Sequence, residues 1–246
     1  MSCSQPDLFL DNDNESVSAL FSNDDTGEYQ GLEKLYELSA DAYSAVVNAR
    51  MDDTLNKTCL PKYINKVLSA AENMILLKSG NKTDDQLAVR EAADKAACDR
   101  GDPLVRTVLE SAQKVGREIH RLMGLLRFNP INDGIWLAKC APDNSILPVF
   151  AYYFTMRFGD ASWAIIDEKR GMALVRLSGE EPSVGPIAAF SFLSDLSPAE
   201  DDWEKLWQSY HRSVFIENRK NPGLQIQLMP RRYWKYLPEV NQNSAD

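Results

Sequence analysis

Near Asn129 the spacing of apolar residues in this chain changes from a helical to an extended period. Before that point, apolar side chains recur every three or four residues, which is typical of helices with one buried face. After it, short apolar runs such as Ile135 to Cys140 stand between turn residues, which is typical of strands. The sequence therefore predicts an α+β fold, with a helical N-terminal half followed by a small, mainly antiparallel sheet flanked by helices.

Four helices are expected in the first half of the chain. The fourth and longest has the clearest start, because Asp102 is a favourable N-cap and Pro103 suits the first helical position. The second is expected to begin after Pro61 and to stop at Gly80. The expected helical ranges are 29–50, 61–80, 84–99 and 102–127.

A hairpin is the strongest strand signal in the second half, because two apolar runs flank the polar turn 168–171. A turn at Asn132, Asp133 and Gly134 precedes an earlier strand. The expected elements are a strand over 135–140, a short helix over 145–158, strands over 163–167 and 172–177, a loop over 179–186 and a further strand over 187–193.

The stretch that follows opens with another helix signal. Ser197, Pro198 and Glu200 form a capping box with proline at the first helical position. The apolar residues after it fall on one helical stripe, which we expect to be buried. This stripe consists of Trp203, Leu206, Trp207, Tyr210 and Val214.

Charge is distributed unevenly along the chain. The formal net charge is −9, and eight Asp or Glu residues precede Lys34 without any Lys or Arg. We interpret residues 1–28 as an acidic mobile arm, residues 29–101 as a helical region and residues 102–240 as an α+β core. From His211 to Leu237 six Lys or Arg accompany a single acid, Glu217, so an anionic partner is expected to bind there.

Several classes of site lack their sequence signals. No apolar run is long enough for a membrane span, and the N-terminus has no basic region typical of a secretory signal, so a cytoplasmic protein is expected. Phosphate-binding loops, nucleophile elbows and zinc or iron–sulfur patterns are missing, so no cofactor and no metal are predicted. The four cysteines are expected to be reduced thiols: Cys3, Cys59, Cys98 and Cys140.

Three stretches carry a resemblance when they are read together: His120 to Phe128, Trp163 to Arg170, and Leu206 to Lys235. They combine several Trp residues with His and Arg in a fixed order. By this pattern, residues 105–239 resemble the DUF4130 family. That family is associated with DNA metabolism or DNA repair, and its domain lies beside a radical-SAM protein or is fused to a uracil-DNA-glycosylase-like domain. The resemblance therefore implies DNA, and a radical-SAM or uracil-DNA-glycosylase-like protein, as partners.

His120 is the best placed candidate for proton transfer. Gly116 and Gly124 lie one helical turn to either side of it, and Arg121 and Arg127 are nearby cations. Histidine titrates near neutrality, so His120 could act as a general acid or base, with Arg127 holding a phosphate and Arg121 contacting it. The alternative is a buried structural imidazole, with the glycines allowing another backbone to pack closely.

Two further groups of polar residues could be functional or structural. Asp167 and Arg170 bracket the predicted hairpin turn, where ordinary turn chemistry is the favoured explanation. Near the C-terminus, cations alternate with aromatic residues, which suits phosphate contact and base stacking. For the aromatics the favoured explanation is instead that they anchor the C-terminus, whereas for the cations phosphate contact and a solvated edge stay equally open. The cations are Arg219, Arg231, Arg232 and Lys235.

Three functions are compatible with these observations. The first is an accessory protein of DNA metabolism or repair that binds DNA or a modified nucleotide and acts with a radical-SAM or glycosylase partner. The second is a DNA-processing enzyme of glycosylase or phosphodiesterase type that uses His120 as its acid or base. The third is a non-catalytic protein-interaction module.

Overall fold

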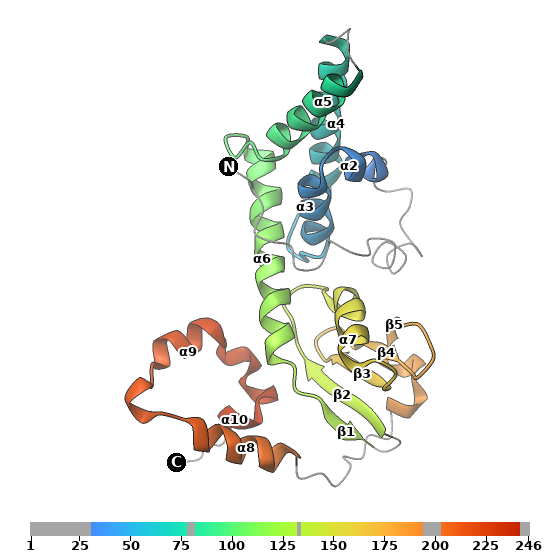
Figure 1. Cartoon of the computed structure of the whole chain (residues 1–246). Helices are drawn as coiled ribbons and strands as arrows, with labels where there is room; N and C mark the ends of the chain where they lie inside the picture. The colour runs from blue at the N-terminus through green and yellow to red at the C-terminus, as the bar shows by residue number, and fades with distance from the viewer. Residues whose placement is uncertain (1–30, 78–81, 132–133, 194–202, 242–246) are drawn as a thin grey trace. The chain divides into compact units, whose positions relative to one another are not determined.

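A computed structural model describes residues 31–77, 82–131, 134–193 and 203–241 (Figure 1). It divides into two compact units, residues 1–118 and 119–246, and the boundary falls inside one long helix. The acidic arm, the helix stop at Gly80 and the capping box at Ser197 lie outside the described residues.

The described part of the first unit is built from helices, as the apolar spacing predicts. Expected and observed ends agree within a few residues for the last three, whereas the first expected helix is split in two. The helices are α2 (Leu32–Leu38), α3 (Ala40–Arg50), α4 (Cys59–Leu77), α5 (Lys82–Ala97) and α6 (Pro103–Leu125), of which α6 continues into the second unit.

The split occurs at Ser39, whose backbone is extended at φ −153° and ψ 103°. The Ser39 side chain accepts a hydrogen bond of 3.2 Å from the backbone N–H of Ala42, so it caps α3. Because the apolar residues keep one spacing through the break, periodicity alone predicts a single helix over 29–50.

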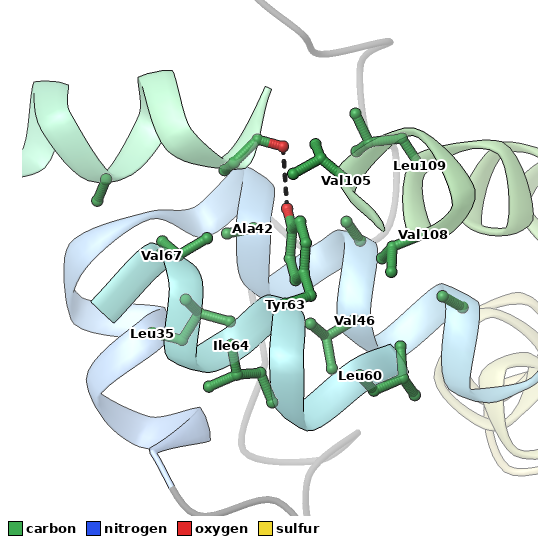
Figure 2. Packing of buried hydrophobic residues seen from close by; sticks show 14 of the residues in the cluster. Leu35, Ala42, Val46, Leu60, Tyr63, Ile64, Val67, Val105, Val108 and Leu109 are labelled. Carbon is green, nitrogen blue, oxygen red and sulfur yellow. Dashed lines mark hydrogen bonds between the residues drawn. The ribbon is translucent and has the colours of Figure 1, made fainter. Parts of the chain in front are cut away.

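The core of this unit lies between α2, α3, α4, α5 and the first half of α6 (Figure 2). Leu60, Tyr63 and Ile64 of α4 have no exposed surface. Tyr63 satisfies its one polar group by donating a 3.1 Å hydrogen bond to the carbonyl of Ala97, drawn as a dashed line in Figure 2. A buried tyrosine therefore joins α4 to α5 without leaving an unpaired hydroxyl.

The start of α6 is as expected. The Asp102 carboxylate accepts hydrogen bonds from the backbone N–H groups of Leu104 at 2.7 Å and Val105 at 3.2 Å. Pro103 is the first residue of the helix. The N-cap and the N-terminal proline are thereby confirmed.

Asp52 is a buried acid of this unit with several hydrogen-bond donors around it. Its Oδ1 accepts from the Thr54 hydroxyl at 2.6 Å and from Lys114 Nζ at 3.0 Å, and its Oδ2 accepts from the Ser111 hydroxyl at 2.9 Å. Burial alone would raise its pKa, but these hydrogen bonds hold the pKa of Asp52 well below its ordinary value. The carboxylate is thus kept charged and joins the loop after α3 to α6.

The second unit contains a five-stranded sheet whose strands follow chain order. Only β2 and β3 pair in parallel, and the other neighbours in this described sheet pair antiparallel. The expected strands at 135–140 and 163–167 and the hairpin are confirmed, and so is the α+β class. The strands are β1 (Asn129–Ile131), β2 (Ile135–Cys140), β3 (Trp163–Asp167), β4 (Met172–Arg176) and β5 (Ser183–Pro186).

Both faces of β3 are covered, since all five of its residues are buried. On one face the aromatic rings of α7 (Phe150–Phe158), which follows the 3-10 turn η2 (Leu147–Val149), lie close to Trp163. On the other face, Ala164 and Ile166 belong to an apolar cluster with Leu193. The parallel pairing of β2 and β3 requires a crossover connection, and α7 supplies it.

The strand expected over 187–193 is wrong. The residues 183–186, expected as loop, form β5, and two 3-10 turns follow, η3 (Ile187–Ala189) and η4 (Ser191–Leu193). The last bond of the ladder runs from the Ile187 N–H to the carbonyl of Gly171 at 3.0 Å. The chain then turns and places Phe190 against Gly185, 3.4 Å from where a Cβ would stand. The apolar residues of this stretch pack on the sheet rather than extending it.

Candidate functional site

The C-terminal segment of the second unit consists of short helices and turns. Asn221 caps the helix α9, because its side chain accepts a 3.0 Å hydrogen bond from the N–H of Leu224. The elements are α8 (Trp203–Val214), η5 (Glu217–Arg219), α9 (Pro222–Leu228), η6 (Arg231–Tyr236) and α10 (Pro238–Asn241).

The apolar stripe of α8, expected to be buried, is exposed instead. Leu206 is 58% exposed, Tyr210 54% and Val214 52%, while the side chain of Trp203 lies outside the described residues. Every residue from 212 to 228 is exposed as well. Amphipathic spacing shows that a helix has an apolar face, but here the described elements leave most of that face uncovered.

Trp207 is the point at which α8 is held. The Arg127 guanidinium lies 5.5 Å from the centroid of the Trp207 ring, and Arg127 also forms a 2.6 Å ion pair with Glu239 of α10. Two further hydrogen bonds run from Arg127 to the carbonyl oxygens of Gly124 and Leu126. Arg127 therefore joins the end of α6 to α8 and α10, which differs from the phosphate-holding role predicted for it.

The Glu239 side chain is buried at this junction. Burial favours its neutral form, but hydrogen bonds from Arg127 and Trp207, together with the charge of Arg127, lower the pKa of Glu239 below its ordinary value. The acid is therefore charged at neutral pH and neutralises the arginine within the protein.

The turn η6 is fastened to the sheet by two of the predicted cations. Arg232 forms an ion pair with Asp143, and Lys235 forms one of 3.0 Å with Glu168. The Tyr236 hydroxyl donates to the same Glu168 at 2.8 Å, and burial together with this acid raises the pKa of Tyr236 to about 12. Arg232 and Lys235 are thus engaged in holding the C-terminus.

Arg219 and Arg231 are placed differently. Both are exposed, and neither has a carboxylate partner within the ranges that the structure describes. Arg231 lies over the Trp234 ring at 5.7 Å, and the Trp234 indole donates a 2.7 Å hydrogen bond to the carbonyl of Met229. The aromatic residue is therefore anchored, and the cation above it faces solvent.

The chain segment that carries these two arginines is poor in acids. From Lys205 to Leu237 the chain has seven Lys or Arg and one acid, Glu217. All seven are exposed: Lys205, Arg212, Arg219, Lys220, Arg231, Arg232 and Lys235. We name residues 205–237 the C-terminal surface.

His120 lies on an exposed face of α6, so it is not the buried structural imidazole that was the alternative to a catalytic role. Within the described residues its ring has no hydrogen-bond or ion-pair partner. A Cβ on Gly116 or Gly124 would meet nothing within 4 Å, so no backbone packs closely at either glycine. Arg121 is half-buried on the same helix. The structure does not bring His120 and the Arg127 guanidinium into one enclosed site.

Asp167 and Arg170 form a structural turn. The Asp167 carboxylate accepts hydrogen bonds from the backbone of Lys169 and Arg170 and pairs with the Arg170 guanidinium at 2.8 Å. Arg170 also donates to the carbonyl oxygens of Pro142 and Asp143. These hydrogen bonds fasten the hairpin turn to the loop after β2, which is the structural explanation favoured from the sequence.

The described residues include no group of three or more His, Cys, Asp or Glu positioned to hold a metal ion. Among the same residues, no helix is both long and apolar enough to cross a membrane.

Three acids that anchor this segment were missed by sequence reasoning: Glu239, Glu168 and Asp143. The Arg127–Glu239 pair spans 112 positions and the Lys235–Glu168 pair spans 67, so no local spacing indicates either one. The only signal was the surplus of cations near the C-terminus, which was interpreted as a site for an anionic partner or as a solvated edge.

Comparison with known proteins gives one match. A family model described as "Domain of unknown function (DUF4130)" matches residues 81–239, and thus covers the whole C-terminal surface and begins at α5. No curated protein matches the chain, and no solved structure matches it.

Proposed function

The chain belongs to the DUF4130 family, and on that premise we propose that it is an accessory protein of DNA metabolism or repair. In this proposal the C-terminal surface binds DNA or a modified nucleotide, and the protein acts in the cytoplasm with a radical-SAM or uracil-DNA-glycosylase-like partner. No enzymatic role is assigned to His120, because no described feature encloses it with a second catalytic group.

The observation that carries the proposal is the state of the cations on the C-terminal surface. Exposed Arg219 and Arg231 lack carboxylate partners among the described residues, and only one acid lies on the entire surface. Phosphates are the usual ligands of such cations, since releasing condensed counterions drives association with nucleic acid. The negative net charge of the whole chain does not oppose this, because eight of its acids precede Lys34.

In this proposal the partner protein binds exposed aliphatic residues of α9. Leu224, Ile226 and Leu228 of α9 are all exposed, and no charged residue lies between Asn221 and Pro230. Monomeric proteins rarely leave such apolar surface open to water, and an uncharged segment offers nothing to a phosphate. A protein surface is therefore the better match for α9.

Binding of labelled DNA across a salt series tests the proposal. We expect affinity to fall steeply with salt. The double substitution Arg219→Ala and Arg231→Ala should reduce the slope by roughly 0.7–0.9 for each phosphate that the variant no longer neutralises. Arg232 and Lys235 are unsuitable for this test, because replacing them also releases η6 from Asp143 and Glu168.

The matched control is Arg90→Ala with Arg100→Ala, which removes two exposed arginines of the first unit and the same total charge. This control should leave the salt slope unchanged. Absence of DNA binding at low salt, or equal effects of the two double variants, would contradict the proposal.

A further inference from the structure

We infer that the nucleic acid bound by the C-terminal surface is single-stranded, with bases stacking on Tyr210 and Phe215. The inference rests on the proposed function and specifies its ligand. It starts from the aromatic rings of α8 and the residue that follows it, rather than from the cations.

The aromatic rings of α8 and Phe215 form two pairs, each with one ring that is about half exposed. Tyr210 is 54% exposed and Phe215 47%. The rings of Trp207 and Tyr210 have centroids 5.8 Å apart, and those of His211 and Phe215 are 6.3 Å apart. Each pair is inclined at 33°, and the two pairs occupy successive turns. Residues four apart are neighbours on a helix surface, so Trp207 and His211 place the two pairs one after the other in a row along α8.

The members of this row differ in how firmly they are held. Trp207 packs against the Arg127 guanidinium, which is itself paired with buried Glu239, so it forms a fixed base for the row. Tyr210 leans on this fixed ring and keeps more than half of its own surface free. A ring that packs against one fixed neighbour and keeps about half of its surface exposed can stack with a planar ligand.

Bases offer their flat faces only when they are not already stacked within a duplex. Stacking on aromatic side chains is how proteins hold single strands without reading their sequence, and cations along the path contact the phosphates. On α8 itself, Lys205 and Arg212 are exposed cations. The rings are π faces rather than the guanidinium and amide groups that read base edges in a duplex groove.

The test measures binding of fluorescein-labelled oligo(dT) of about 20 nucleotides, long enough for one binding site, and of a duplex of the same length. We expect the intact chain to bind oligo(dT) at least tenfold more tightly than the duplex. Tyr210→Leu with Phe215→Leu should weaken oligo(dT) binding about tenfold or more and leave duplex binding unchanged, because leucine keeps the apolar character and loses the ring.

Two controls separate stacking from general apolar contact and from misfolding. Tyr210→Phe keeps the ring and should bind oligo(dT) as the intact chain does. Leu206→Ala with Leu224→Ala removes exposed aliphatic side chains of the same surface and should also have no effect on oligo(dT) binding. Both leucines are exposed, as Tyr210 and Phe215 are, so none of these substitutions opens the core.

The outcomes distinguish this inference from the proposed function. Equal or tighter binding of the duplex, or an unchanged oligo(dT) affinity in the leucine double variant, overturns the inference while DNA binding itself stands. Ring-dependent preference for oligo(U) over oligo(dT) supports stacking of single strands but contradicts the DNA role. The intact chain could also self-associate through these rings. If Tyr210→Leu with Phe215→Leu abolishes self-association but leaves oligo(dT) binding intact, the inference is overturned and the rings belong to a protein interface.

Discussion

The apolar faces of α4 and α8 have similar spacing and opposite environments. In α4, Leu60, Tyr63 and Ile64 have no exposed surface, and the neighbouring helices enclose them (Figure 2). In α8, Leu206 and Tyr210 are each more than half exposed. The difference teaches that periodicity identifies a face that prefers to leave water, but the surrounding elements decide whether the chain itself covers it. Uncovered apolar faces of this kind are typical of interaction surfaces rather than of cores.

The largest expected difference between the two regions concerns matched leucines. Leu60→Ala should lower the free energy of unfolding by about 2–5 kcal/mol, because it leaves a cavity in an enclosed core. Leu224→Ala, at an exposed position of α9, should change it by less than about 0.5 kcal/mol. Urea unfolding followed by circular dichroism measures both. Similar losses for the two variants would mean that α9 is packed as tightly as α4.

The second comparison concerns the buried ion pair that holds α8 and α10. Glu239→Ala leaves the largely buried Arg127 without its acid and should cost about 3 kcal/mol, within the range for breaking a buried pair. Glu217→Ala removes the partner of Lys220 at an exposed 3.4 Å pair and should cost less than about 0.5 kcal/mol. Thermal unfolding measures the loss of stability in both variants. A small loss for Glu239→Ala would mean that the ion pair with Arg127 does not anchor α8 and α10.

The third comparison uses pH. Because the pKa of Asp52 is lowered on folding, its stabilisation is present above its ordinary value of 3.8 and is lost as pH falls toward the lower folded value. Asp52→Asn should therefore lower the free energy of unfolding by about 1–2 kcal/mol at neutral pH. The difference in this free energy between the variant and the unaltered chain should become smaller below about pH 4.

Its control is Asp53→Asn, at the exposed neighbouring acid. Urea unfolding at several pH values measures both variants. A gap for Asp52→Asn that stays constant down to acidic pH would mean that the charge of Asp52 is not what stabilises its loop.

The smallest expected effect is at the cap that divides the first expected helix. Ser39→Ala removes the hydrogen bond to Ala42 and should cost about 1 kcal/mol. Ser209→Ala, at an exposed position within α8, should be neutral within about 0.5 kcal/mol. Chemical unfolding compares the two, and a neutral Ser39→Ala would mean that the break between α2 and α3 depends on packing alone.

Local signals in the sequence predicted those parts of the fold that local interactions determine. The N-cap at Asp102 and the hairpin of β3 and β4 are examples, because a cap and a turn need only adjacent residues. The break at Ser39 was missed, since the apolar spacing continues through it. The strand β5 was missed because its short sequence has no strand signal of its own. It is a strand because it pairs with β4 in the folded sheet.

The candidate site was predictable only in composition. The excess of cations near the C-terminus was visible in the sequence, but the sequence did not show which of them pair with acids of the same chain. Arg232 and Lys235 pair with acids distant in the sequence, whereas Arg219 and Arg231 have no such partner among the described residues. The ion pair of Arg127 was missed for the same reason, since Glu239 lies 112 positions away. Long-range pairing is a property of the folded chain and has no local pattern.

The exposed segment 212–228 also determines how the protein would respond to a protease. Arg212, Arg219 and Lys220 lie in an exposed stretch with little packing to protect it, so trypsin should cut there before it cuts the helices of the first unit. The C-terminal fragment would still be held to the rest of the second unit by three ion pairs: Arg232–Asp143, Lys235–Glu168 and Arg127–Glu239. A nicked molecule would therefore stay in one piece under native conditions and separate into two fragments only in denaturant.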